Sequence, residues 1–147
     1  MLKTLAKLYE TDFFAWTEET TKLIKQRQFN QVDWNSVIEE IESLGKSDKR
    51  ELKSRLAVLM QHLLKWQYQP KLRSFSWQNT IDEQRNSITD LLNDSPSLRP
   101  YLSEIIDQCY HRGRKAAINE TGLSANSFTS EYCYTMTQIL DANFLPE

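Results

Sequence analysis

Apolar residues recur every three or four positions along most of the chain, which is the spacing of one face of an α-helix. The longest such stripe steps 4-3-4-3 through Leu52, Leu56, Leu59, Leu63 and Trp66. Shorter stripes of the same kind occupy 9–23, 34–44, 77–92 and 98–117. The pattern predicts an all-α fold: an antiparallel bundle of about five helices, with a short further helix near 136–140.

Capping residues predict where these helices begin and end. Asp12, Asp33, Ser47 and a serine at 74 or 76 are good N-caps, because a short side-chain oxygen accepts a hydrogen bond from the first turn. Gly122 is a plausible terminator of the fifth helix, and small residues at 113, 116 and 117 would let a neighbouring helix approach that helix closely.

Gly45 is predicted to end the second helix, because glycine adopts the left-handed conformation after a helix C-terminus without a steric penalty. Residues 34–44 and 47–69 would then form a helical hairpin, with 47–69 as the central helix of the bundle. In that hairpin Glu42 would face the region of Arg50, and Glu39 would lie toward Arg55.

Length and composition agree with a single helical domain over 1–147. The chain is 39% hydrophobic and 26% charged, and its three glycines and four prolines lie at breaks in the periodic pattern. The net charge of −2 gives no overall attraction to nucleic acid. Charge is unevenly placed, however, since 46–85 carries +5 between flanking segments of −3 and −4.

The expected location is the cytoplasm. Cys109 and Cys133 have no disulfide-type or metal-type spacing, which favours two reduced thiols. Residues 1–8 carry lysines among their apolar positions and do not predict a signal peptide. No apolar run approaches the ~20 residues that span a bilayer, so no membrane association is expected.

His62 and Gln84 are the polar residues placed most unusually in the apolar pattern. His62 lies beside the stripe of its helix, and it could serve as an acid–base group helped by Arg55 and Gln84. The simpler interpretation is a histidine at the core boundary and an amide that fixes helix register by a hydrogen bond. No nucleophile–base pair can be recognised, so we assign no catalytic residue.

The sequence predicts no metal site and no cofactor. Helical di-iron sites need Glu-x-x-His on two helices, whereas Leu59 and Gln108 stand three positions before the two histidines. The chain also lacks a glycine-rich phosphate loop, a Gly-x-Ser-x-Gly elbow and a Cys-x-x-Cys pair.

Aromatic and cationic residues alternate between 65 and 85. Lys65, Lys71, Arg73 and Arg85 could hold phosphates while Tyr68 or Trp77 stacks on bases, as in proteins that bind single-stranded nucleic acid. The structural alternative is that Trp66 and Trp77 pack across a helix turn and the cations are solvated. This segment supplies most of our candidate binding residues, which are His62, Lys65, Tyr68, Arg73, Trp77, Gln84 and Arg85.

We interpret the chain first as a helical module that binds another protein or a second copy of itself, through a face that includes Trp77 or Tyr68. The basis is the surplus of apolar and aromatic residues without a catalytic constellation. Nucleic-acid binding through 65–85 is the alternative, and an enzyme that uses His62 is a third.

Several motifs occur in a fixed order along the chain: Asp12-Phe13 with Trp16, the run 39–45, His62-Leu63-Leu64-Lys65-Trp66, Gln69-Pro70, Ser76-Trp77 and Phe144-Leu145-Pro146. In this order they resemble a bacterial family of domains of unknown function, number twenty-nine of that series. The resemblance covers nearly the whole chain. It implies an all-helical fold and carries no activity, cofactor or partner with it.

Overall fold

The computed structural model describes the backbone from Leu2 to Glu147 and the side chains from Thr4 onward. Met1 and the side chains of Leu2 and Lys3, part of the N-terminal segment examined for a signal peptide, lie outside the described residues. Over 2–147 the chain contains helices and no strand, which confirms the all-α prediction. The helices are α1 (Leu2–Thr11), α2 (Phe13–Lys25), α3 (Trp34–Tyr68), α4 (Phe75–Asp94), α5 (Arg99–Thr121) and α6 (Met136–Leu140).

Internal contacts divide the chain into two units, Met1–Ser47 and Asp48–Glu147, which we describe separately as the N-terminal and C-terminal units. The N-terminal unit holds α1, α2 and the beginning of α3. The C-terminal unit holds the remainder of α3 and all later helices. The prediction of one domain over 1–147 stays a prediction.

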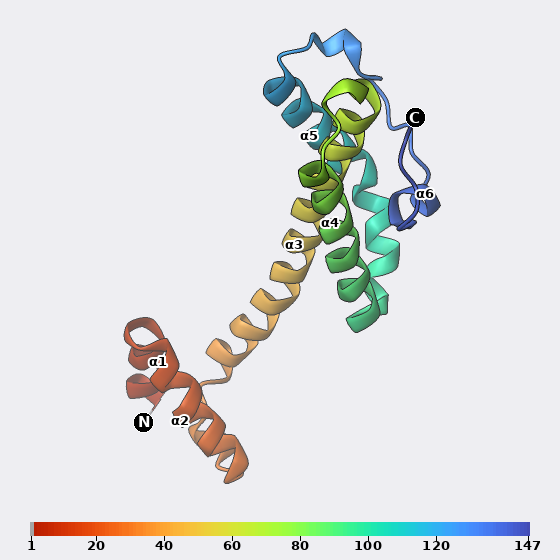
Figure 1. Ribbon diagram of the computed structural model, residues 1–147. Helices are drawn as coiled ribbons and strands as arrows, with labels where there is room; N and C mark the ends of the chain where they lie inside the picture. The colour runs from red at the N-terminus through yellow and green to blue at the C-terminus, as the bar shows by residue number, and fades with distance from the viewer. Residues whose placement is uncertain (1) are drawn as a thin grey trace. The chain divides into compact units, whose positions relative to one another are not determined.

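The N-terminal unit is a small helical cluster in which α1 and α2 pack on each other (Figure 1). Asp12 caps α2 by accepting a hydrogen bond from the backbone N–H of Ala15, as its sequence position predicts. The sequence pattern missed α1 as a separate helix. The core cluster of the unit consists of Leu5, Leu23 and Val32, and Trp16 is buried beside the rings of Tyr9 and Phe13.

Helix α3 corrects the predicted hairpin. It runs without a break through Gly45 and Ser47, so Gly45 does not end a helix and Ser47 does not begin one. Of the described glycines, Gly122 is the one with a positive φ, whereas Gly45 keeps the helical conformation. The predicted pairing of Glu39 and Glu42 with cations across a hairpin is therefore wrong, and Arg55 instead bonds to Glu51 on its own helix at 2.9 Å.

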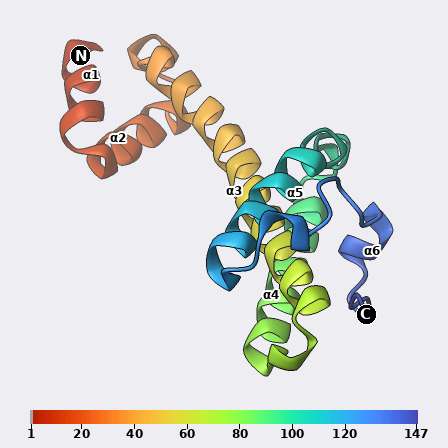
Figure 2. The same cartoon turned by 90° about the horizontal axis from the view of Figure 1, so that it is seen from above.

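The C-terminal unit is built around the second part of α3. Figures 1 and 2 show α4 and α5 packed along this part of the helix. The predicted apolar stripe from Leu52 to Leu63 is fully buried and forms the centre of a large core. A Cβ atom on Gly113 of α5 would lie 2.6 Å from the carbonyl oxygen of Ala57 on α3, so the predicted close approach of helices is confirmed at this glycine.

Most boundaries in the C-terminal unit follow local signals. Ser74 accepts a hydrogen bond from the N–H of Trp77 and caps α4, and Gly122 ends α5 with a φ of 71°. Thr135 and Gln138 form a reciprocal capping box at the start of α6. The side chains of Phe144 and Leu145 pack against the core beyond α6, as expected.

Candidate functional site

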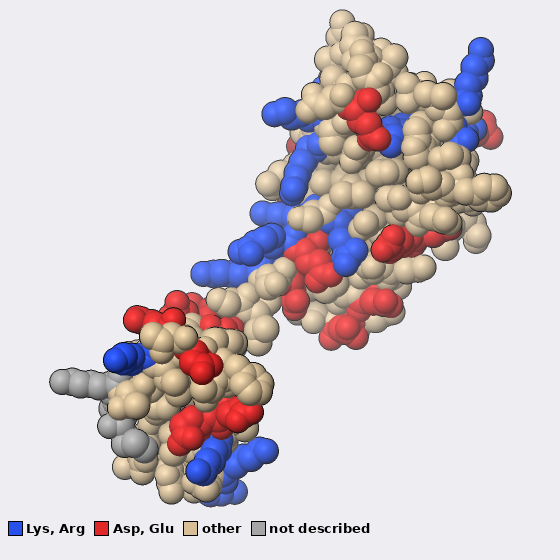
Figure 3. All heavy atoms as spheres, turned by 60° about the vertical axis from the view of Figure 1, so that its left-hand side comes forward, with Lys and Arg blue, Asp and Glu red and all other residues tan. Residues whose placement is uncertain are grey.

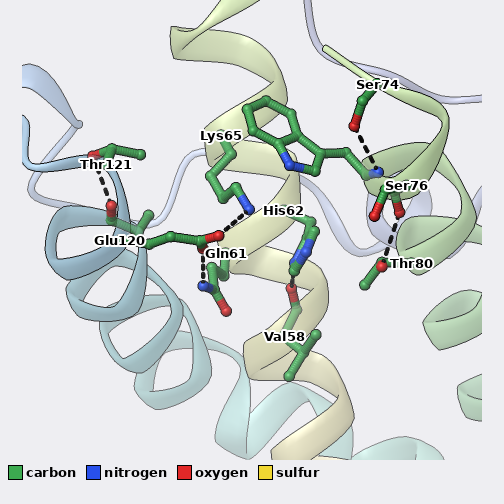
Figure 4. A network of polar contacts seen from close by, with 11 residues as sticks. Val58, Gln61, His62, Lys65, Ser74, Ser76, Thr80, Glu120 and Thr121 are labelled. Carbon is green, nitrogen blue, oxygen red and sulfur yellow. Dashed lines mark hydrogen bonds and ion pairs between the residues drawn. The ribbon is translucent and has the colours of Figure 1, made fainter. Parts of the chain in front are cut away.

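A polar cluster lies on α3 where α4 and α5 approach it (Figure 4), and it consists of Gln61, His62, Lys65, Trp77 and Glu120. Lys65 is only 2% exposed, so its position is not that of the solvated cation the structural alternative assumed. Its Nζ atom lies 2.7 Å from Glu120 Oε1 and 4.5 Å from the centroid of the Trp77 ring. The charge of this buried ammonium is thus balanced by a carboxylate on one side, and an aromatic face attracts it on the other.

Lys65 and burial shift the pKa values of the neighbouring Glu120 and His62. The hydrogen bond from Lys65 lowers the pKa of Glu120 below its usual range, so this carboxylate is ionised at neutral pH. Burial lowers the pKa of His62, and the nearby ammonium of Lys65 acts in the same direction. His62 is therefore neutral near pH 7.

The orientation of His62 follows from a hydrogen bond within its own helix. Its Nδ1 atom lies 2.9 Å from the carbonyl oxygen of Val58, so in the neutral ring Nδ1–H donates and Nε2 carries the lone pair. Among the described side chains, none with a hydroxyl, thiol or carboxyl group is hydrogen-bonded to His62. The arrangement provides one accepting nitrogen without a nucleophile that it would activate.

Arg55 and Gln84 meet in a shallow groove between α3 and α4. The Arg55 Nη1 atom donates to Gln84 Oε1 at 3.2 Å, which is an interhelix hydrogen bond of the kind expected for this amide. The groove has a volume of about 270 Å³ and is lined by Glu51, Ser54, Arg55, Val58 and Gln84. His62 does not line it and is linked to it through the Val58 carbonyl, so the proposed trio of His62, Arg55 and Gln84 does not form one site.

Arg85 and Arg73 bind backbone carbonyls near the end of the chain. Arg85 is 2% exposed, and its guanidinium donates to the carbonyls of Ile139 at 2.8 Å, Phe144 at 2.7 Å and Gln138 at 3.2 Å. Arg73 donates to Trp66 O at 2.8 Å and to Pro146 O at 3.4 Å. Both arginines hold the segment around α6 to the rest of the C-terminal unit.

The candidate residues of 65–85 do not share one exposed face. Lys65 and Arg85 are buried, Arg73 is engaged with carbonyls, and the Tyr68 ring packs edge-on against Phe128 with centroids 5.3 Å apart. Of the four cations predicted to hold phosphates, Lys71 alone is both exposed and without a described hydrogen bond or ion pair. The geometry that a nucleic-acid groove requires is therefore missing in this segment.

The N-terminal unit carries an apolar surface that the sequence analysis did not predict. Four large side chains follow one another at 4-3-3 spacing along α3 and are 42%, 52%, 63% and 67% exposed, namely Trp34, Ile38, Ile41 and Leu44. We call them the α3 stripe. The sequence predicts these residues in the first arm of a hairpin, and that hairpin does not form because α3 continues through Gly45.

The α3 stripe is exposed because α3 uses a different face within its unit. Ser36 is buried, Val37 packs against the small core, and Glu40 accepts a hydrogen bond from the Tyr9 hydroxyl. That bond raises the pKa of Tyr9 to about 12. Trp34 is held at the start of the stripe by a hydrogen bond of 2.8 Å from its Nε1 atom to Phe29 O.

Exposed carboxylates lie beside this surface. Glu39 and Glu42 are exposed on the same turns of α3 as the stripe, and Glu40 follows Glu39 directly. Figure 3 shows acidic side chains distributed over the N-terminal unit. Within the described part of the chain, neither Glu39 nor Glu42 takes part in an ion pair.

The described residues form neither a membrane-spanning helix nor a cluster of metal-ligating side chains. Between Leu2 and Glu147, no helix has both the length and the apolar character needed to cross a membrane. The same residues contain no group of three histidine, cysteine, aspartate or glutamate side chains placed to hold a metal ion.

Comparison with known proteins places the chain in a family. No curated protein and no solved structure matches it. A family model described as "Domain of unknown function DUF29" matches residues 8–145, which include nearly all of both units. The motif resemblance noted in the sequence is thereby confirmed, and the chain belongs to the DUF29 family.

Proposed function

We propose that this protein is a helical protein–protein interaction module whose binding face is the α3 stripe of the N-terminal unit. The observation that carries the proposal is the exposure of Trp34, Ile38, Ile41 and Leu44 along one face of a helix. Contiguous exposed apolar surface marks interaction sites, because a monomer gains nothing by keeping it in water. Steps of three and four residues are also the spacing by which a helix presents anchors to a partner.

The chemistry of the stripe suits a specific contact. An exposed tryptophan is the side chain most enriched among residues that dominate binding energy. Trp34 is fixed by its hydrogen bond to Phe29 O, so little side-chain entropy remains to be lost when a partner binds. This face replaces the one around Trp77 and Tyr68, whose rings are engaged within the C-terminal unit.

The proposal extends to the location. Cys109 and Cys133 are both free thiols, and free thiols are typical of reducing compartments. We place the protein in the bacterial cytoplasm on that basis together with the family resemblance. Nucleic-acid binding is not part of the proposal, because Lys65 and Arg85 are buried.

Site-specific photo-crosslinking in producing cells tests the binding face. A photoreactive phenylalanine analogue at Ile38 or Ile41 is expected to give discrete adducts with one protein. The matched control is Phe75 in the C-terminal unit, which is 85% exposed and therefore equally available to random collisions. Equal adducts at both places, or none at the stripe, would contradict the proposal.

A further inference from the structure

The carboxylates beside the α3 stripe restrict the chemistry of the partner. We infer that the segment that docks on the stripe is an amphipathic helix whose apolar face is flanked by lysine or arginine. This inference rests on the proposed function and adds the charge and the secondary structure of the bound segment to it.

The positions of the carboxylates follow from helix geometry. At about 100° per residue, Glu42 lies roughly 80° and Glu39 roughly 140° around α3 from Trp34, on the same side. Glu40 lies on the opposite side and is engaged with Tyr9. Glu42 therefore lies directly beside Ile38 at the edge of the stripe, and Glu39 lies behind it, further around the same side of the helix. We call this side of the helix the acidic border.

The acidic border is available to a partner. Lys46 is the one cation a single turn beyond Glu42, and the two side chains do not form an ion pair in the structure. A cationic residue on a docked helix would meet the apolar surface and the exposed carboxylate of Glu42, with the carboxylate of Glu39 behind it. Such charge complementarity adds specificity and speeds association.

A second copy of the chain suits this surface poorly. In an antiparallel pair of α3 helices the border of Glu39 and Glu42 would face the same border of the other copy. In a parallel pair it would face the side that carries Asp33 and Glu40. Carboxylates meet carboxylates in both arrangements, and like-charge contacts disfavour association.

The stripe also sets the size of the partner segment. From Trp34 to Leu44 a helix rises about 15 Å, which corresponds to roughly three turns of a docked helix. An extended strand would instead need unpaired backbone groups to bond with, and the backbone of α3 is already paired within the helix. A short amphipathic helix is thus the matching shape.

Two synthetic peptides of about eighteen residues provide the test. Both carry the same leucine seam at helical spacing, flanked by lysines in one and by glutamates in the other. Fluorescence anisotropy with the full chain is expected to show at least about tenfold tighter binding of the lysine peptide. The difference should shrink as salt is raised from ~0.05 to ~0.5 M, because exposed charges are screened.

A charge exchange sharpens the test. The double variant Glu39→Lys/Glu42→Lys should prefer the glutamate peptide, since both substitutions are at exposed helix positions and leave the core untouched. Ile38→Asn/Ile41→Asn should abolish binding of both peptides, whereas Phe75→Ser should change neither affinity. Circular dichroism of each variant confirms that the helices are retained.

Each failure has a separate meaning. Equal binding of the two peptides, lost in the Ile38→Asn/Ile41→Asn variant, overturns the cationic partner and leaves the interaction module standing. A preference that the charge exchange does not reverse, or binding of neither peptide, also overturns the inference. A concentration-dependent dimer of the wild-type chain that Ile41→Asn abolishes would identify a second copy as the occupant and overturn it as well. The photo-crosslinking experiment tests the interaction module independently of the peptides.

Discussion

The two units of this protein differ in how much of their large apolar side chains on α3 is buried. In the C-terminal unit the leucine side chains of α3 from Leu52 to Leu63 are fully buried, and even Lys65 and Arg85 are buried. In the N-terminal unit the core cluster comprises three buried residues with two partly buried ones beside it, Trp16 is buried outside that cluster, and the α3 stripe remains exposed. The same spacing of apolar residues thus forms a stabilising core in one unit and an exposed surface in the other.

The largest effect is expected from the three hydrogen bonds that Arg85 donates to backbone carbonyls, which we call the carbonyl clamp. Arg85→Met keeps the volume of the side chain but leaves the carbonyls of Ile139 and Phe144 without this donor, while the Gln138 carbonyl keeps its hydrogen bond from the Asp141 N–H. We expect a loss of about 3–5 kcal/mol in the free energy of unfolding, measured by urea denaturation. A loss below ~1 kcal/mol would show that water replaces the guanidinium and that the clamp contributes little.

Gly113 probes the tightness of packing in the same unit. A Cβ atom there would lie 2.6 Å from Ala57 O and 2.7 Å from Met60 Cβ, so α3 and α5 must separate. Gly113→Ala should lower the stability by about 1–3 kcal/mol. An unchanged denaturation midpoint would contradict the close contact between these helices.

Gly45 provides the matched substitution in the N-terminal unit. It has nothing within 4 Å of a built Cβ atom and a helical conformation. Gly45→Ala should therefore stabilise the protein by roughly 0.5–1 kcal/mol, because alanine has the higher helix propensity. A destabilised variant would instead indicate that residue 45 adopts the left-handed conformation expected from the sequence. Circular dichroism measures the helix content of the variant.

The smallest expected effect is a pH dependence that belongs to the C-terminal unit. Burial lowers the pKa of His62 below its usual value of 6.5, so the unfolded chain binds more protons over the interval between the two values. Stability contributed by neutral His62 is present above pH 6.5 and is lost as the pH falls through that interval. The charged groups that act on the ring are Lys65, which lowers its pKa, and Glu120, which raises it.

His62→Gln should flatten this part of the stability profile, measured by urea denaturation at several pH values. His111→Gln is the control, because that histidine lies on the surface next to Asp107. An equal flattening in the two variants would assign the pH dependence to general charge effects and not to the buried ring.

Local signals predicted much of the fold. The caps at Asp12 and Ser74 and the left-handed Gly122 were correctly identified because each acts within one helical turn. Gly45 was wrongly predicted to end a helix, because a glycine does so only in the left-handed conformation and the sequence does not reveal that conformation. A clue was present: Ile41 and Leu52 are eleven residues apart, or about three helical turns, so the two predicted stripes are in phase on one helix.

The candidate site was harder to predict than the helices. His62, Lys65 and Trp77 were named from sequence and do lie together, since two of them share a helix and the third begins the next one. Their partner Glu120 is 55 residues from Lys65, and no spacing rule connects them. The exposure of the α3 stripe was equally hidden, because an apolar pattern does not say whether anything covers it.

The clamp formed by Arg85 has a consequence for how the chain acquires its structure during synthesis. The carbonyls that this arginine binds are 53 to 59 residues further along the chain, so they leave the ribosome long after α4. Until then the C-terminal unit contains a cation without its acceptors. The N-terminal unit has its whole core between Leu5 and Val37 and can fold first, so the surface proposed to bind partners would exist on a nascent chain before the larger unit is complete.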